Sequence, residues 1–253
     1  MKLLALVPLA LRALRRRLLL LCAFAALLLA FAGSGRLLSG GADHVELDPI
    51  FQLGGATLAS AFLLSGWIIG RLPLIMTLVL LAGIFSQDRD TGTARLYYAR
   101  PVAPLAVYGT RFLVLAFLAF AFCAVIMPLF DLILLSQWAG PATFVLVAAN
   151  VIAYGTVVAV LSVWTRADAW ITLLLAMLAI AWHGLRAGGL LDAVPVGGRD
   201  FVTVLLPPHG PLLALENAFG QLSPIPWGAV LDVCVYGLTM LVIAAFALGR
   251  REV

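Results

Sequence analysis

Lysine, and charge in general, is what this sequence lacks. Lys2 is the only lysine among 253 residues, and charged residues make up 11% of the chain. A phosphate-binding P-loop has the pattern Gly-x-x-x-x-Gly-Lys-Ser/Thr, in which the lysine reaches the phosphates. Because Lys2 has no such glycines before it, the sequence excludes a P-loop. We therefore expect no ATP hydrolysis by this chain alone.

Cysteine and histidine are also scarce, with three of each. Cys22, Cys123 and Cys234 lie in separate apolar segments, which excludes a disulfide framework and the spacing of a metal site. The histidines His44, His183 and His209 form no pair at three- or four-residue spacing. Each is interpreted as a single polar residue, and no metal ligand is predicted. An intramembrane hydrolase would need a nucleophile beside a base at membrane depth, and no histidine meets this condition. We therefore expect no catalytic residue.

Apolar residues are abundant instead: 64% of the chain is hydrophobic and the mean hydropathy is +1.11. A soluble domain of this length cannot bury so much apolar surface, so lipid must cover part of it. The pattern predicts a single all-α domain over residues 1–253, a polytopic membrane protein with six transmembrane helices. The predicted spans are Leu18–Ala32, a segment that begins no later than Leu72 and ends at Ser86, Phe112–Leu135, Ala142–Val163, Ala169–Leu185 and Trp227–Leu248.

Three segments outside these spans have membrane character. Residues 1–17 mix leucines with basic residues, which predicts an amphipathic helix on the inner membrane surface and a first span that is retained rather than cleaved. Residues 50–70 fit either one long, kinked second helix or a separate outer half-helix. In residues 186–226, Pro207 and Pro208 separate two apolar stretches, which predicts short interfacial or re-entrant outer helices.

The distribution of basic residues predicts the orientation, because cytoplasmic loops are rich in Lys and Arg. With both termini cytoplasmic, 12 of the 16 basic residues lie inside, and only Arg36, Arg71, Arg186 and Arg199 lie outside. The net charge of +4 is therefore a signal of topology, and no nucleic-acid partner is expected. Arg71 lies near the outer boundary, where we interpret it as an interface anchor, with a substrate ligand as the alternative.

Polar residues inside the predicted spans are candidates for a transport pathway or a subunit interface. Asp131 and Asp232 lie within or beside the third and sixth spans, and carboxylates in a membrane are costly and often functional. Asn150 and Tyr154 lie one helical turn apart in the fourth span. They are candidates for a dimer interface, while hydrogen bonding to a neighbouring helix is the simpler explanation.

The predicted cytoplasmic loop 87–101 is dense in charge within a charge-poor protein. A short helix is predicted over Thr93–Arg100. Gly92 permits a tight turn before this helix, and Pro101 ends it, since the residue before a proline avoids helical geometry. This organisation is typical of a docking element rather than of a simple hinge.

The residues of this loop carry a resemblance to a known family. An acidic-x-acidic-x-Gly-Thr pattern begins at Asp88, and an Arg-Leu pair, two tyrosines, an alanine and Arg-Pro-Val follow. This pattern resembles the signature of ABC-2 type ABC transporter permeases, and Gly109-Thr110-Arg111 is similar to the Gly-Lys opening of that family's third span. One departure is Asp88, where the family usually has Glu, so the charge is kept with a shorter reach.

The resemblance implies a permease subunit of an ATP-driven transporter, more often an exporter, in a bacterial inner (plasma) membrane. It implies two partner ATPase subunits, which carry the ATP and Mg, and a second permease chain, identical or related. By this resemblance the ATPase-coupling residues are Asp88, Asp90, Gly92, Thr93, Arg95, Leu96, Tyr97, Arg100 and Pro101. The alternative reading is an ion-coupled secondary transporter or a channel that acts without an ATPase.

Overall fold

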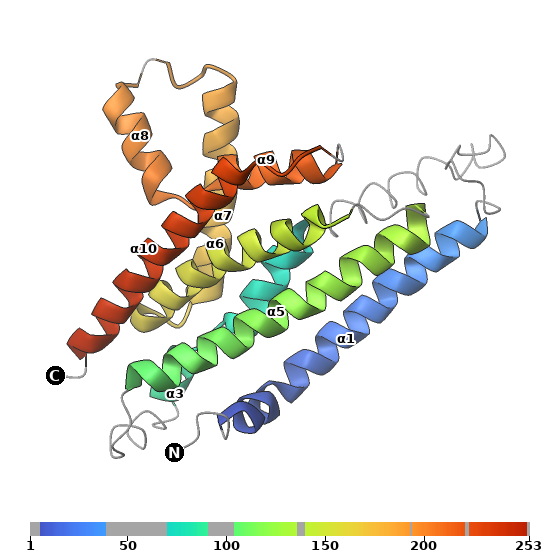
Figure 1. Cartoon of the computed structure of the whole chain (residues 1–253). Coiled ribbons are helices and arrows are strands. Elements are labelled where there is room, and N and C mark those ends of the chain that lie inside the picture. The colour runs from blue at the N-terminus through green and yellow to red at the C-terminus, as the bar shows by residue number, and fades with distance from the viewer. Residues whose placement is uncertain are drawn as a thin grey trace.

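The computed structural model describes residues 6–38, 70–90, 104–135, 140–192, 194–220 and 223–251, and every element in these ranges is an α-helix (Figure 1). Five of the described helices are long and apolar enough to cross a membrane: Gly70–Asp88, Leu105–Ile133, Ala142–Trp164, Asp168–Ala187 and Trp227–Arg250. This length and composition are those of a multi-pass membrane protein. The predicted all-α class is confirmed for these residues.

The last four predicted spans coincide with α5 (Pro104–Leu135), α6 (Ala142–Trp164), α7 (Asp168–Ala187) and α10 (Trp227–Arg251). The largest difference is at the start of α5, which was predicted at Phe112. The helix begins at Pro104 because proline has the backbone angle of a first helical residue and needs no hydrogen-bond donor there.

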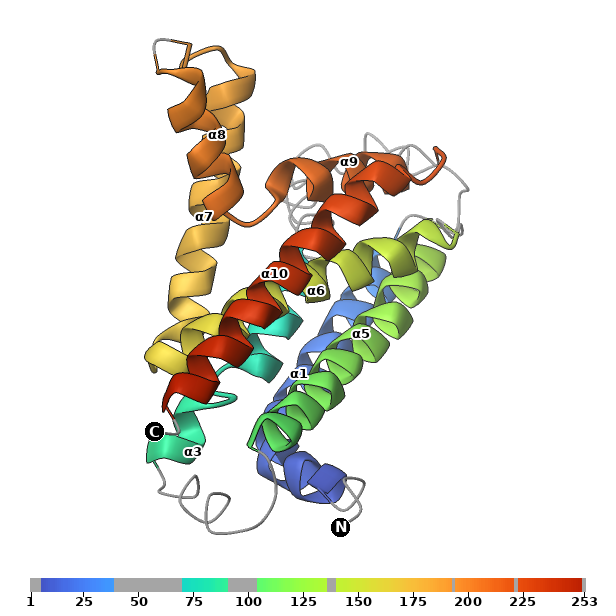
Figure 2. The same ribbon diagram turned by 60° about the vertical axis from the view of Figure 1, so that its left-hand side comes forward.

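The N-terminal helix α1 runs without interruption from Leu6 to Leu38. The sequence predicted a surface helix up to residue 17 followed by a span, but no helix end occurs at that boundary. Neither glycine nor proline occurs between Leu9 and Ala32, so the sequence contains nothing there that would end a helix. The first turns do lie at an angle to the rest of α1 (Figure 2).

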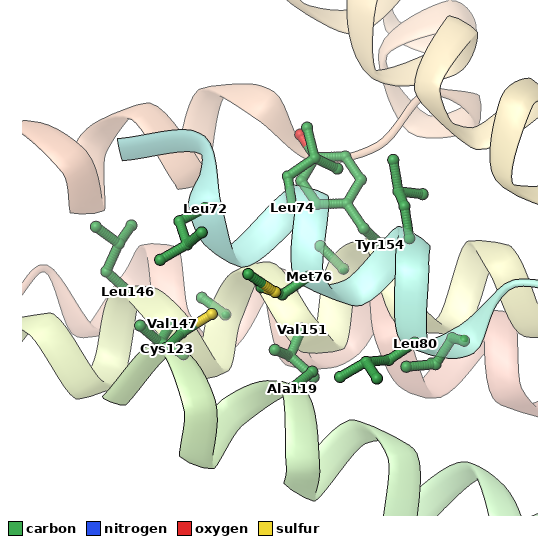
Figure 3. Packing of buried hydrophobic residues seen from close by; sticks show 14 of the residues in the cluster. Leu72, Leu74, Met76, Leu80, Ala119, Cys123, Leu146, Val147, Val151 and Tyr154 are labelled. Atoms are coloured by element: carbon green, nitrogen blue, oxygen red, sulfur yellow. The ribbon is translucent and has the colours of Figure 1, made fainter. Parts of the chain in front are cut away.

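Helix 70–81 is enclosed by the rest of the chain. Leu72, Met76 and Leu80 are at most 1% exposed and recur every four residues. Figure 3 shows these side chains between α5 and α6, near Cys123, Val147 and Ala119. A helix that is apolar all round is buried in this way. The helix ends in a turn at residues 82–85, and the short α3 (Ser86–Asp90) follows.

α6 is the central helix, and it packs against α5, α7, α9 and α10. Seven of its 15 buried residues are Gly, Ala, Ser or Thr, including Ala149, Ala153 and Gly155, and such small residues let neighbouring helices approach closely. The closest approach is to α10, where a methyl group at Gly237 would overlap with Cγ2 of Ile152. Glycine at this position is therefore required by the packing of α6 on α10.

The segment between α7 and α10 contains two short helices, α8 (Val196–Leu205) and α9 (His209–Gly220), as the proline pair predicted. α8 forms a hairpin with the end of α7 (Figure 2). The polar side of α8 faces α7: Thr203 Oγ1 accepts hydrogen bonds from Trp182 Nε1 and Arg186 Nη1, both 3.1 Å long. Its apolar side, including Phe201 and Val204, is exposed.

The bundle has two ends with different contents (Figures 1 and 2). The first turns of α1, the helix α3 and the last turn of α10 lie together, and we call this the α3 end. α9 lies at the opposite end, which we call the α9 end. α1 begins at the α3 end and α10 ends there, which agrees with the predicted order of the spans.

Candidate functional site

At the α3 end, an ion pair joins α3 to α5. Arg111 Nη1 donates to Oδ2 of Asp88 at 2.7 Å, and the side chains are only 18% and 11% exposed. Asp88 lies in the first turn of α3, where a negative charge is favourable. The sequence singled out both residues separately, because one belongs to the acidic pattern and the other opens the third span. That they form a pair was not predicted.

Asp168, which the sequence analysis did not single out, holds the turn before α3. Gly83 has a φ of 73°, a left-handed conformation that glycine adopts without strain. Its backbone N–H donates to Oδ2 of Asp168 at 2.7 Å, and Oδ1 of Asp168 accepts from the N–H of Ala169 at 2.8 Å. One buried carboxylate therefore serves both the first turn of α7 and the turn after helix 70–81. The available signal was an acidic residue at the start of a predicted span.

Arg17 of α1 contacts the same turn. Its Nη1 donates to the carbonyl oxygens of Val79 at 3.1 Å and Ala82 at 2.8 Å. Carbonyl groups in the last turn of a helix have no partner within the helix, and a basic side chain can satisfy them. Arg17 is thus not simply one more charge of a basic flank, since it fixes α1 to the end of helix 70–81.

The other predicted coupling residues lie beyond or at the edge of the described ranges. Asp90 is the last residue of α3, and its side chain is not described. Outside the described residues lie Gly92, Thr93, Arg95, Leu96, Tyr97, Arg100 and Pro101. Their contact with an ATPase stays a prediction.

At the α9 end, Arg71 of helix 70–81 forms an ion pair with Glu216 of α9. The side chains are 24% and 20% exposed, so both charges are largely removed from solvent. Sequence reasoning interpreted Arg71 as an interface anchor, with a substrate ligand as the alternative, and did not pair it with Glu216. The pair fastens α9 to the start of the buried helix.

Two histidines that the sequence analysis treated as single residues meet beside this pair. The rings of His183 in α7 and His209 in α9 lie edge to face, with centroids 5.5 Å apart. The His183 ring lies against the backbone of Gly210, since a Cβ there would be in ordinary van der Waals contact with Cε1 of His183, at 3.4 Å. His209 is 7% exposed. No sequence spacing indicates this contact, since the two residues belong to different helices.

The electrostatics of the α9 end favour a neutral imidazole. Burial lowers the pKa of His209 to about 4, and the charges of His183 and Arg71 act in the same direction. Burial raises the pKa of the Glu216 carboxyl, and the ion pair with Arg71 partly offsets this increase. We call the surface of α6, α7 and α10 on which α9 packs the seat of α9. Near neutral pH, this region contains the Arg71–Glu216 ion pair and an uncharged His209.

The candidates for a pathway or interface have different surroundings. Asn150 and Tyr154 of α6 are buried within the chain, and Asn150 Nδ2 donates to the carbonyl of Leu146 in its own helix at 2.9 Å. Asp131 is buried, and its Oδ2 has no hydrogen-bond partner among the described residues. Asp232 is exposed on α10. The proposed roles of these four residues stay predictions.

The described part of the chain contains no group of three or more His, Cys, Asp or Glu residues that could hold a metal ion. Both polar clusters instead connect helices that are distant in the sequence. The chain matches no family model, no curated protein and no solved structure. Arguments about function therefore rest on its own residues and their geometry.

Proposed function

We propose that this chain is the permease subunit of an ATP-binding cassette transporter of the ABC-2 type. The observation that carries the proposal is the ion pair between Asp88 and Arg111. These residues begin and end the sequence pattern that resembles that family. Their contact ties α3, which precedes residues 91–103 in the chain, to α5, which follows them, at one fixed point.

Three contacts around that point would transmit a displacement of the loop to the helices. The Asp88–Arg111 pair leads to α5, the bond from Gly83 to Asp168 leads to α7, and Arg17 leads to α1. A docking element needs such a rigid base, because a movement that bends a loose loop moves no helix. This arrangement supports a role of residues 87–101 as a coupling helix region seated on an ATPase.

The rest of the assembly follows from the same proposal. α1 supplies a sixth crossing, both termini and loop 87–101 are cytoplasmic, and α8 and α9 are on the outer side. Two ATPase subunits bind ATP and Mg, and this chain binds neither. A second permease chain, identical or related, completes a substrate pathway on a two-fold axis, the commonest symmetry of oligomers. Transport is outward, since that family mostly exports.

The experiment is co-purification and ATP hydrolysis in liposomes. The tagged chain is co-expressed with each candidate ABC ATPase of its own genome, native mass spectrometry counts the subunits, and phosphate release measures turnover. We expect two permease and two ATPase chains. Asp88→Lys is expected to lower phosphate release at least about tenfold, because it places two positive charges together at the base of the loop. Asp200→Lys, an exposed change on α8, is the matched control and should leave phosphate release unchanged.

The double variant Asp88→Arg/Arg111→Asp distinguishes a structural role from a docking role. Exchange of the charges restores an ion pair inside the chain but removes the acidic group from the loop. If Asp88 also contacts the ATPase, subunit assembly recovers while phosphate release stays low. A transport-competent particle with no ATPase would contradict the whole assignment.

A second candidate function is ion-coupled transport without an ATPase, and the environment of Asp131 favours it. A buried carboxylate oxygen without a partner in a membrane helix is a natural site for a proton or cation. The chain reconstituted alone would then carry an ion-driven flux, and Asp131→Asn would abolish it. A flux that appears only with the ATPase and ATP would exclude this candidate.

A further inference from the structure

The seat of α9 combines an apolar face with a titratable edge. Leu212, Leu215 and Ala218 lie on one face of α9 and are at most 5% exposed. α9 packs there against α6, α7 and α10. His209 in its first turn and Glu216 further along supply the polar contacts. α9 therefore covers parts of three helices at one end of the bundle.

Each described element around His209 carries a charged or titratable group, and the two that act on His209 itself are His183 and Arg71. α7 contributes His183, helix 70–81 contributes Arg71, and α9 itself contributes Glu216. α6 contributes Tyr154, which lies within electrostatic reach of Arg71 and Glu216. α10 contributes Tyr236, close to Tyr154, and carries Asp232 one turn earlier. Among the described residues of this cluster, Glu216 is the carboxylate that forms an ion pair, and its partner is Arg71.

We propose that α9 is released by protons: it leaves its packing surface on α6, α7 and α10 when the medium at the α9 end becomes acidic. Protonation of His209 places an imidazolium beside Arg71 and His183, at a site whose carboxylate is already paired. The repulsion is relieved when α9 moves into solvent. This equilibrium belongs to the chain alone, so it does not depend on an ATPase and is tested without one.

The direction of the effect follows from proton binding in the two states. His209 has a pKa of about 4 when α9 is seated and its ordinary value of 6.5 when α9 is released. The released state therefore binds more protons, and its relative population rises as the pH falls through this range, by up to about 30-fold at pH 5. Glu216 acts in the opposite direction, because its pKa is raised in the seated state, so 30-fold is an upper value.

Thiol labelling of the full chain in lipid nanodiscs measures release. The three native cysteines are replaced by alanine, and one cysteine is introduced at Leu215, which is buried, or at Asn217, which is exposed on the same helix. The ratio of the two labelling rates cancels the intrinsic pH dependence of the thiol and reports the released fraction. We expect the labelling rate at residue 215, divided by the rate at residue 217, to rise at least about fivefold from pH 7.5 to pH 5.

Two histidine variants decide whether His209 is the sensor. His209→Asn keeps a polar side chain that cannot be protonated, and its ratio should stay constant over the same pH range. If Asn prevents seating, which a ratio near one at neutral pH would show, His209→Gln takes its place. His183→Asn removes one neighbouring charge and should reduce the rise. Two results would overturn the proposal. One is a labelling-rate ratio that stays constant with pH when both histidines are present. The other is a rise that is undiminished in the His209 variant or in the His183 variant.

Discussion

The backbone N–H of Gly83 and the carboxylate of Asp168 are 85 residues apart in the chain and form a hydrogen bond of 2.7 Å. Asp168 is the first residue of α7, and His183 near the other end of α7 contacts His209. A helix of 20 residues is about 30 Å long. α7 thus connects the turn before α3 with the seat of α9. As a rigid helix, it couples a displacement at one end to the other.

The Gly83–Asp168 contact is expected to contribute measurably to stability. Asp168→Ala removes the acceptor of two backbone N–H groups in a buried site and should lower the free energy of unfolding by about 1–3 kcal/mol. Thermal unfolding in detergent, followed by size-exclusion chromatography, measures the change. Asp192→Ala is the control, since Asp192 is 77% exposed and its surface pair with Arg199 contributes little. Equal stability of both variants would show that the contact is not formed.

The Arg71–Glu216 pair gives a second prediction. Glu216→Gln leaves the guanidinium of Arg71 largely buried without its counter-charge and should cost about 2 kcal/mol. The double variant Arg71→Met/Glu216→Leu removes both charges and should recover most of the loss, because apolar groups of similar volume can replace a buried pair. Thermal unfolding of the three proteins tests this. A double variant that is less stable than Glu216→Gln would contradict it.

Close packing of α6 and α10 predicts a sharp difference between two glycines of the same helix. Gly237→Ala forces a methyl group against Ile152 and should destabilise the chain by about 1–3 kcal/mol. Gly249→Ala meets no atom within 4 Å and should be neutral or slightly stabilising, because alanine favours helix more than glycine does. The difference in unfolding temperature between the two variants is the measurement, and its absence would mean that the helices lie further apart.

Orientation in the membrane is predicted by the basic residues. In a background without the native cysteines, Arg95→Cys should react only after the membrane is permeabilised, and Asp200→Cys should react in intact cells. A membrane-impermeant maleimide distinguishes the two sites. Labelling of residue 95 from outside in intact cells would reverse the proposed topology.

Helix positions were predictable because hydrophobic runs and prolines are local signals. Ala142 and Trp227 begin α6 and α10 where the apolar runs begin, and Pro207 and Pro208 separate α8 from α9 as expected. The continuity of α1 across residue 17 was not predictable in the same way. A change from basic to apolar composition alters the solvent that a helix prefers, but it does not break the hydrogen bonds of the backbone.

The polar contacts were out of reach of sequence patterns. Arg71 and Glu216 are separated by 145 residues, and Arg17 and Ala82 by 65. Such pairs depend on which helices become neighbours, and hydrophobicity does not specify this when every helix is apolar. The charge-dense loop 87–101 was recognised by composition, yet Asp168, which holds the turn before α3, directly precedes the predicted span Ala169–Leu185 and was not singled out.

The fit of Gly237 against Ile152 also has a consequence for synthesis. α10 follows α6 in the chain, so it leaves the ribosome later than α6 does. Until α10 arrives, the groove of α6 around Ile152 and Thr156 faces lipid or a chaperone instead of its permanent neighbour. Nascent chains that stop before Trp227 therefore lack the permanent partner of this side of α6, and the synthesis of α10 is the step that completes the packing around α6.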